Sequence, residues 1–178
     1  MPKTLFITLP VADLGVSTAF YKALGFRQNP QFSGGDAAAM VWSESVQVML
    51  VTHAKWRTFT QRPLPPAGSC GLMLSLALDS RAAVDAMNAA AAAHGGQADV
   101  NPMEDHGFML TRDLADPDGH LWAALWMDPE AMPAASYACA AAGRAFSARA
   151  AWARWPARAP RRGSGSGPGR TCTGRPAG

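Results

Sequence analysis

Two stretches of the chain repeat the same order of apolar and polar positions. In the first, an apolar, β-prone run at 4–11 predicts a strand, and Asp13 predicts the N-cap of a helix that ends at Gly25. One face of this helix is apolar, with Val16, Phe20, Ala23 and Leu24 at helical spacing. Three strands are expected after it, a weakly indicated one near 28–32 and stronger ones at 37–42 and 46–52. This half therefore has the order strand, helix, three strands.

The second stretch has the same order. A strand at 71–78 precedes the capping pair Asp79-Ser80, and an alanine-rich run at 81–93 predicts a helix that ends at His94-Gly95-Gly96. Strands are expected next, weakly at 97–102 and more strongly at 108–114 and 120–127. The last two strands are joined by Asp-Pro-Asp-Gly at 116–119, in which Pro at the second position and Gly at the fourth are typical of a type I turn.

Two tandem βαβββ units predict an α+β fold, in which two modules form a curved mixed sheet around a cavity with the helices outside. The modules cover about 3–53 and 70–130, and both lie within one domain at 1–133. Between them, a linker at about 57–69 contains Pro63, Pro65 and Pro66.

Three motifs occur in order along these modules: Leu-Pro-Val-Ala-Asp-Leu at 9–14, Phe-Tyr-x-x-Leu-Gly-Phe at 20–26, and Asp-Pro-Asp-Gly-His-Leu-Trp at 116–122. In order and spacing they resemble the vicinal oxygen chelate superfamily of glyoxalases, extradiol dioxygenases and bleomycin-resistance proteins, over about residues 3–130. The resemblance implies the paired βαβββ fold. Because that scaffold hosts many activities, function has to be argued from the side chains at the site.

Metal-dependent members of that superfamily resemble each other in four inward-pointing ligands, His, Gln or Glu, one on each of four strands. The resemblance carries these positions onto Phe6, Leu50 (or a neighbour one residue away), Met73 and Ala123. None of these side chains offers the oxygen or nitrogen lone pair that a hard or borderline cation needs, and methionine offers only a soft thioether. No metal ligand and no cofactor is therefore predicted.

Strand alternation predicts what lines the cavity. On the last strand, Trp122 and Trp126 share one face, while Leu121, Ala123, Leu125 and Met127 share the other. If the tryptophans pack under the helices, the cavity is apolar with a few hydroxyls, which suits an aromatic or aliphatic ligand. The predicted ligand-binding residues are Phe6, Thr8, Leu50, Met73, Arg112, Leu121, Ala123 and Leu125. The alternative is that these side chains simply fill the space as core.

Few polar groups remain that can do chemistry. His53 and His106 are the candidates for a general base, and the alternative for each is a histidine in a surface loop. Arg112 can meet an anionic ligand with its planar guanidinium, or it can pair with an acid. Trp56 is among the tryptophans that can stack on a planar ligand.

Charge is distributed unevenly. The chain of 178 residues has a formal net charge of +3, but residues 1–133 hold eight Lys/Arg and all thirteen acids, whereas 134–178 hold eight Arg and no acid. Because the domain is acidic, the charge of the whole chain does not argue for nucleic-acid binding, which is not expected. The segment 134–178 is rich in Ala, Arg, Gly and Pro, a composition that predicts disorder. One alternative is a basic arm that binds nucleic acid or an anionic surface. Another is that the segment is a frame-shifted read of GC-rich coding sequence.

Cysteine usage and the lack of a long apolar run indicate the cytoplasm. Cys70, Cys139 and Cys172 are odd in number and have no C-x-x-C spacing, so they predict neither a disulfide framework nor a metal motif. No stretch approaches the ~18 apolar residues of a membrane span, and Pro10 breaks the apolar run at the start. No membrane partner is predicted.

The leading functional prediction is a small-molecule-binding protein that lacks the usual metal ligands and sequesters, or acts on, an apolar or aromatic compound. The second hypothesis is a metalloenzyme of lactoylglutathione-lyase or extradiol-dioxygenase type with relocated ligands, His53 and His106 with Glu104 or Asp105; a divalent metal is expected only there. A third is a degraded gene copy. The resemblance also implies a homodimer, because sheets of this fold commonly pair between chains.

Overall fold

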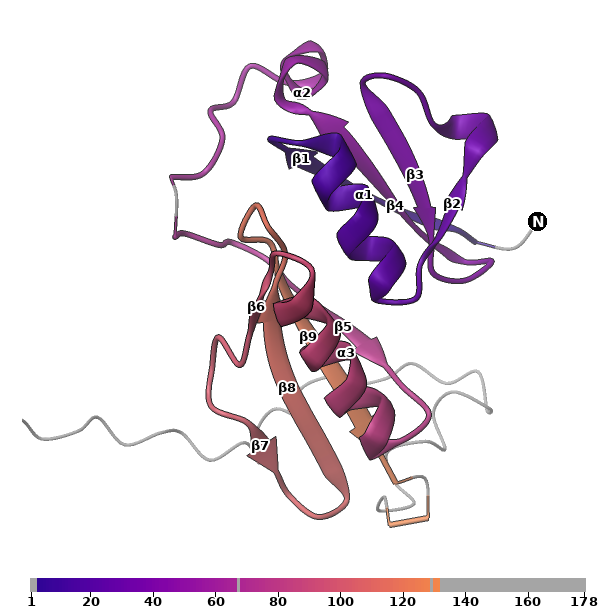
Figure 1. Ribbon diagram of the computed structural model, residues 1–178, viewed down its shortest axis with the longest axis vertical. Helices are drawn as coiled ribbons and strands as arrows, with labels where there is room; N and C mark the ends of the chain where they lie inside the picture. Colours follow the sequence, from indigo (N-terminus) through magenta and orange to yellow (C-terminus); the bar gives the residue numbers. More distant parts are fainter. Residues whose placement is uncertain (1–2, 67, 129, 132–178) are drawn as a thin grey trace, which may run out of the picture. The chain divides into compact units, whose positions relative to one another are not determined.

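The computed structural model describes residues 3–66, 68–128 and 130–131, which form two consecutive modules (Figure 1). The first module consists of β1 (Leu5–Val11), α1 (Leu14–Ala23), β2 (Arg27–Asn29), the 3₁₀ helix η1 (Pro30–Phe32), β3 (Ala37–Val41), β4 (Val46–Thr52) and α2 (His53–Phe59). The second consists of β5 (Met73–Ala77), α3 (Arg81–Ala93), β6 (Gln97–Ala98), β7 (Glu104–Asp105), β8 (Met109–Ala115) and β9 (Leu121–Met127). The predicted α+β class with tandem modules is confirmed.

Each module has its own mixed sheet. In the first sheet the order is β1-β4-β3-β2, with β1 parallel to β4 and the other neighbours antiparallel. The second sheet repeats this arrangement as β5-β9-β8-β6, with β5 parallel to β9 and with β7 also paired to β8. The helix α1 packs on β3 and β4, and α3 packs on β8 and β9, so each sheet has one face covered by its own helix.

Local signals in the sequence set the ends of the helices and the main turn. The carboxylate of Asp13 accepts hydrogen bonds from the backbone N–H groups of Gly15 and Val16 at 2.8 and 3.0 Å, which makes it the N-cap of α1 as predicted. Ser80 caps α3 in the same way, through the N–H group of Ala83 at 3.1 Å. The turn at 116–119 is closed by a 3.0 Å bond from the Gly119 N–H to the Asp116 carbonyl.

Four segments differ from the prediction. The strand expected near 28–32 is limited to β2 and is followed by η1, and β7 is a short strand where a loop was expected. The helix α2 occupies 53–59, where the sequence analysis placed only the start of the linker; Thr52 caps it by accepting from the Lys55 N–H at 3.2 Å. The strand expected at 97–102 is limited to β6, because Asp99 takes a positive φ of 50° and turns the chain. The side chain of Asn88 holds that turn, donating to the Asp99 carboxylate at 2.9 Å.

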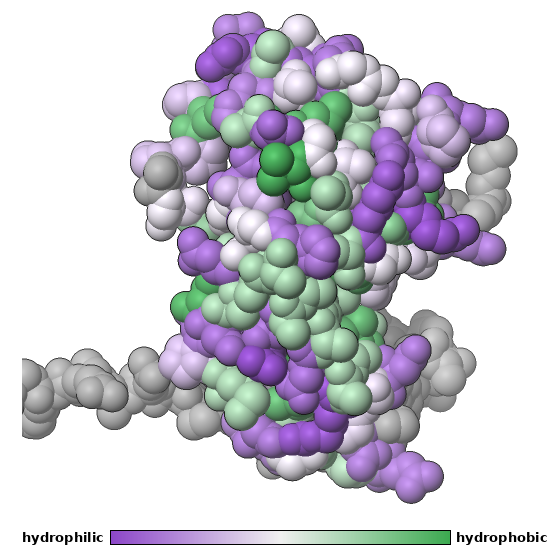
Figure 2. Space-filling view, viewed as in Figure 1, coloured by the Kyte–Doolittle hydropathy of each residue, from purple (hydrophilic) through white to green (hydrophobic). Residues whose placement is uncertain are grey.

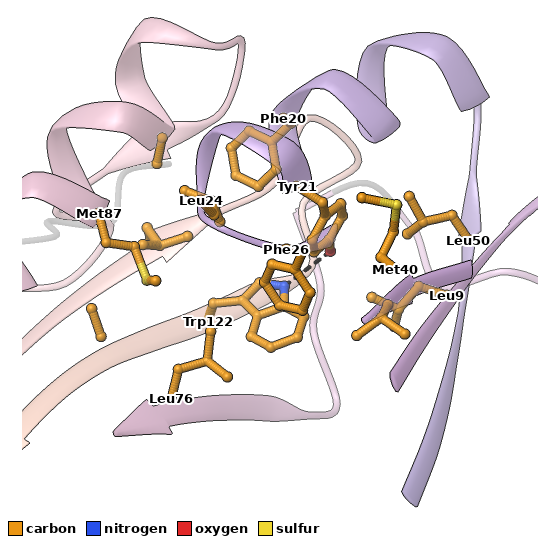
Figure 3. Packing of buried hydrophobic residues seen from close by; sticks show 14 of the residues in the cluster. Leu9, Phe20, Tyr21, Leu24, Phe26, Met40, Leu50, Leu76, Met87 and Trp122 are labelled. Carbon is orange, nitrogen blue, oxygen red and sulfur yellow. Dashed lines mark hydrogen bonds between the residues drawn. The ribbon is translucent and has the colours of Figure 1, made fainter. Parts of the chain in front are cut away.

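Side chains from both modules form one hydrophobic core (Figure 3). The rings of Tyr21 in α1 and Trp122 in β9 are fully or almost fully buried and meet edge to face, with centroids 5.8 Å apart. The indole N–H of Trp122 donates to the Tyr21 hydroxyl oxygen at 3.1 Å. Phe26 contacts both rings, with centroids 5.3 and 5.9 Å away. The second module is thus anchored to the first by aromatic packing.

The outer face of α3 consists mainly of alanine. Ala82, Ala86 and Ala89 are exposed, whereas Val84 and Met87 are buried against the sheet. Figure 2 shows the weakly hydrophobic surface of this helix among more polar neighbours. Alanine stabilises a helix through its intrinsic propensity, so α3 forms although its outer face carries little charge.

The predictions for 134–178, for Cys139 and for Cys172 concern residues outside the described part of the chain. Within the described residues, no helix combines the length and the apolar character that crossing a membrane requires.

Candidate functional site

The pairing of β1 with β4 shows which side chains share a face of the first sheet. Leu50 is fully buried in the core under α1, on the same face as Ile7 and Leu9. The opposite face, which α1 does not cover and which is called the helix-free face below, carries Phe6, which is 59% exposed, and Thr8; α2 contacts β1 and β4 as well. Of the residues predicted to bind ligand on this sheet, Phe6 and Thr8 therefore face away from the helix and Leu50 faces toward it. The neighbours of Leu50 in β4, Met49 and Val51, lie on the Phe6 face.

The second sheet divides in the same way. Trp122 and Ala124 of β9 are buried in the core on the side of α3. Leu121, Ala123 and Leu125 alternate with them and face the helix-free side, as strand alternation predicts. Met73, paired with Leu121 across the sheet, lies on the same side and is 44% exposed. Ala123 is only 3% exposed on this side.

The four positions at which the resemblance implies metal ligands do not fit a metal ion. Phe6, Met73 and Ala123 lie on the helix-free faces but offer no oxygen or nitrogen donor, and Leu50 is core. Within 3–66, 68–128 and 130–131, no three His, Cys, Asp or Glu side chains come close enough together to hold a metal.

A pocket of about 480 Å³ lies beside the carboxyl-terminal half of β1. Its described lining is Thr8, Leu9, Pro10, His53, Trp56, Leu64, Pro65, Pro66, Gly68, Ser69, Cys70, Gly71, Leu72, Leu74, Asp118, Gly119, His120 and Leu121. Most of this lining is apolar. Of the predicted ligand-binding and catalytic residues, the pocket brings together Thr8, His53 and Leu121, and it also includes Trp56. The other predicted residues lie outside its described lining: Phe6, Leu50, Met73, His106, Arg112, Ala123 and Leu125.

Three parts of the chain build the walls of this pocket. The N-cap at Thr52 starts α2, whose first two turns present His53 and Trp56. The linker between the modules supplies the wall at 64–66 and 68–72, where two prolines and two glycines accompany a lack of regular structure. The turn before β9 supplies the third wall.

That third wall is held by hydrogen bonds to the first module. The two carboxylate oxygens of Asp118 accept from the Ala12 N–H at 2.7 Å and from the Ser17 hydroxyl at 3.0 Å. The ring nitrogen Nε2 of His120 lies 2.8 Å from the carbonyl oxygen of Pro10. The turn is therefore fixed against the junction of β1 and α1, and the width of the pocket depends on these bonds.

A buried carboxylate adds a further contact between the 116–119 turn and the first module. Asp116 is 2% exposed, and its Oδ2 accepts a 2.8 Å hydrogen bond from the Tyr21 hydroxyl. Its Oδ1 accepts from the backbone N–H groups of Asp118 and His120, at 3.0 and 2.8 Å. Burial raises the pKa of Asp116 above its ordinary value, and burial followed by the nearby Asp116 charge raises the pKa of Tyr21.

The other predicted polar residues lie outside the pocket lining. The His106 side chain is about half exposed, with Nε2 3.8 Å from the Glu104 carboxylate, so the structure does not bring it to the pocket with His53. Arg112 points to the α3 side of its sheet, where its guanidinium donates to Asp99 at 2.6 and 3.0 Å and to Asp85 at 2.9 Å. Hydrogen bonding to these carboxylates raises the pKa of Arg112 and lowers that of Asp99.

Sequence reasoning left out part of the pocket. The 116–122 motif indicates a turn and the superfamily resemblance, but it assigns no site role to Asp118 or His120, and the linker pattern assigns none to Leu64 or Leu72. The available signal was the proline-rich linker itself, with Pro63, Pro65 and Pro66. It could not indicate a wall, because nothing local shows that a linker folds back over β1.

Comparisons with known proteins agree with this fold. Residues 3–42 match the family model described as bleomycin resistance protein-like N-terminal. A hypothetical protein from S. aureus superposes with a TM-score of 0.60 at 26% identity, covering 71% of this chain and 95% of that one. A glyoxalase/bleomycin resistance protein from Albidiferax ferrireducens T118 gives a TM-score of 0.53 at 26% identity, covering 68% of this chain and 95% of that one.

A glyoxalase-related enzyme from Fulvimarina pelagi gives a TM-score of 0.60 at 20% identity, covering 71% and 88% of the two chains. At that identity the likeness concerns the fold alone. No curated protein matches the chain.

Proposed function

We propose, from the premise that this chain belongs by fold to the vicinal oxygen chelate superfamily, that it binds an apolar or aromatic small molecule, which it sequesters or acts on without the superfamily's usual metal ligands. The observation that carries this proposal is the pocket between β1, α2, the linker and the turn at 116–119. Its volume of about 480 Å³ is in the range of sites that enclose drug-sized ligands, and its lining is mostly apolar with a few polar groups.

The four superfamily ligand positions carry no metal donor, and they lie outside the described lining of this pocket, so a ligand held there is bound without them. Phe6 and Met73 place large apolar side chains where a metal-dependent relative has donors, and Ala123 places a methyl group there. Burying apolar ligand surface contributes about 25 cal/mol for each Å², so an aromatic molecule can be held without a charged contact.

The same proposal includes a homodimer in the cytoplasm. Phe6 and Met73 are 59% and 44% exposed on the helix-free faces of the two sheets. Large apolar side chains that are exposed on a sheet face often mark a protein–protein interface. In a symmetric dimer, the same patch of each copy contacts the other copy.

A thermal-shift screen of the full chain against aromatic compounds and divalent metals tests the proposal. A ligand that binds only the folded protein raises the melting temperature by mass action, by several degrees at 100-fold excess over Kd. Gly71 lines the pocket, and a Cβ added there would meet no atom within 4 Å, so a tryptophan fits without displacing the protein. The indole of Gly71→Trp should then occupy the space of the ligand and abolish the rise in melting temperature. Gly35→Trp is the matched control, since Gly35 is equally open but lies outside the lining.

Two results would contradict the proposal. One is that no aromatic compound raises the melting temperature. The other is that Gly71→Trp leaves the rise unchanged. A rise produced by a metal alone and reversed by a chelator would instead favour the hypothesis of relocated ligands.

A further inference from the structure

Most polar groups in the pocket are already paired within the protein. Both oxygens of Asp118 accept hydrogen bonds from the first module. The hydroxyl of Ser69 and the thiol of Cys70 each donate to a backbone carbonyl oxygen of their own loop, at 2.7 Å in both cases. These groups stabilise the wall and are not available to a ligand.

The two histidines differ in what they offer. Because the Nε2 of His120 faces the carbonyl oxygen of Pro10 at 2.8 Å, it must carry the proton, and a neutral ring then leaves Nδ1 as an acceptor. The imidazole of His53 makes no hydrogen bond or ion pair with any described residue, and the side chain is only half-buried. His53 is therefore a half-buried polar group of this pocket whose two ring nitrogens have no partner among the described residues.

Among its described lining residues, the pocket has no permanently charged group that is left unpaired for an ionic ligand. None of its described lining residues is Lys or Arg, and the one carboxylate, Asp118, is already hydrogen-bonded. An ion that entered would lose hydration without meeting a permanently charged, unpaired side chain among these residues, which is costly. The lining therefore favours a neutral molecule.

The remaining walls suit a planar ring. Trp56 presents an indole on α2, and Leu64, Leu72 and Leu121 contribute aliphatic surface. An aromatic ligand can stack offset on the indole and bury its edges against the leucines.

Resting on the proposed function, we infer that this pocket takes a neutral aromatic molecule with a single hydroxyl group, whose ring lies against Trp56 and whose hydroxyl donates a hydrogen bond to the imidazole of His53. His53 is then the residue that sets specificity, and the apolar walls supply most of the affinity.

Titration of the full chain at pH 7 with three probes tests this inference: 2-naphthol, naphthalene, and naphthalene-2-sulfonate. We expect 2-naphthol to bind at least tenfold more tightly than the anionic sulfonate. His53→Ala should weaken binding of 2-naphthol about fivefold, the size of one neutral hydrogen bond, and leave binding of naphthalene unchanged. His53→Gln, which keeps an acceptor, should recover part of the loss.

His106→Ala is the matched control, because His106 lies outside the pocket lining, and a thermal melt of each variant verifies that it folds. If naphthalene and 2-naphthol both bind but His53→Ala affects neither, the inference is wrong and the proposed function stands. Equal affinity for the sulfonate also overturns the inference. If none of the three probes binds, the inference is wrong, and the proposed function is wrong too if the thermal-shift screen also finds no aromatic ligand.

Discussion

The Tyr21 hydroxyl donates a 2.8 Å hydrogen bond to the buried carboxylate of Asp116, which joins α1 of the first module to the turn between β8 and β9 of the second. The same hydroxyl oxygen accepts from the indole of Trp122. Since the 116–119 turn also forms a wall of the pocket, this bond connects the stability of the two modules with the shape of the candidate site.

Tyr21→Phe should destabilise the protein by about 1–3 kcal/mol. The substitution keeps the aromatic packing but leaves Asp116 Oδ2 and the Trp122 indole N–H without their buried partner. Urea denaturation gives the free energy of unfolding. An unchanged free energy of unfolding would mean that the Tyr21–Asp116 hydrogen bond makes no net contribution to stability. Thr58→Val, at an exposed site on α2, is a control for the loss of one hydroxyl.

Asp116→Asn should change how stability depends on pH. Because burial raises the pKa of Asp116, the folded state binds a proton there at a pH where the unfolded chain does not. This contribution is present at low pH and is lost as pH rises through the folded-state pKa. The stability of the wild type relative to Asp116→Asn should therefore increase between pH 7 and about pH 4.

Urea titrations of the wild type and of Asp116→Asn at both pH values measure this difference. The other carboxyl groups are common to both proteins and cancel. Glu44→Gln, at an exposed position, should show no such change. A constant or decreasing difference would contradict the assignment.

Gly96→Ala should destabilise the protein by about 1–3 kcal/mol through overpacking. An added Cβ would lie 2.4 Å from the carbonyl oxygen of Ala115 and 2.5 Å from the ring of Phe20. Gly35→Ala, which meets no atom within 4 Å, should be close to neutral. Thermal unfolding of the pair measures the difference, and equal melting temperatures would show that the close approach is relieved at no cost.

Asp118→Ala should lower both stability and ligand affinity. It removes the acceptor for the Ala12 N–H and the Ser17 hydroxyl, so the turn loses two of its bonds to the first module. We expect a loss of about 1–2 kcal/mol in unfolding free energy. We also expect weaker binding of any pocket ligand, whereas Asp79→Ala, at an exposed site outside the lining, should leave affinity unchanged. Titration calorimetry on both variants tests this.

The full chain should elute as a dimer, with twice its mass of 18.7 kDa by light scattering. Replacing Phe6 and Met73 together with Gln should shift the mass toward the monomer, because both side chains are exposed and apolar on the helix-free faces. Phe32→Gln, equally exposed on η1, is the control. A monomeric wild type would contradict the expectation.

The sequence alone determined the elements whose signals are local. The carboxylate of Asp13 and the hydroxyl of Ser80 cap their helices because they act on N–H groups two or three residues away. The turn at 116–119 follows from Pro and Gly at fixed positions. Alternation also separated Trp122 from Ala123, since neighbouring residues of a strand face opposite sides whatever the strand packs against.

Tertiary structure decided the rest, because contacts between distant segments leave no local pattern. Neighbouring residues of a strand face opposite sides of the sheet, so an error of one position exchanges core and outer residues. Only the packing of α1 shows that Leu50 belongs to the core under this helix and that Val51 lies on the opposite face. Gly96 looks like a turn glycine in the sequence, yet its neighbour is Phe20 from the first module. The pocket combines β1, α2, the linker and the 116–119 turn, and chain folding alone brings these four segments together.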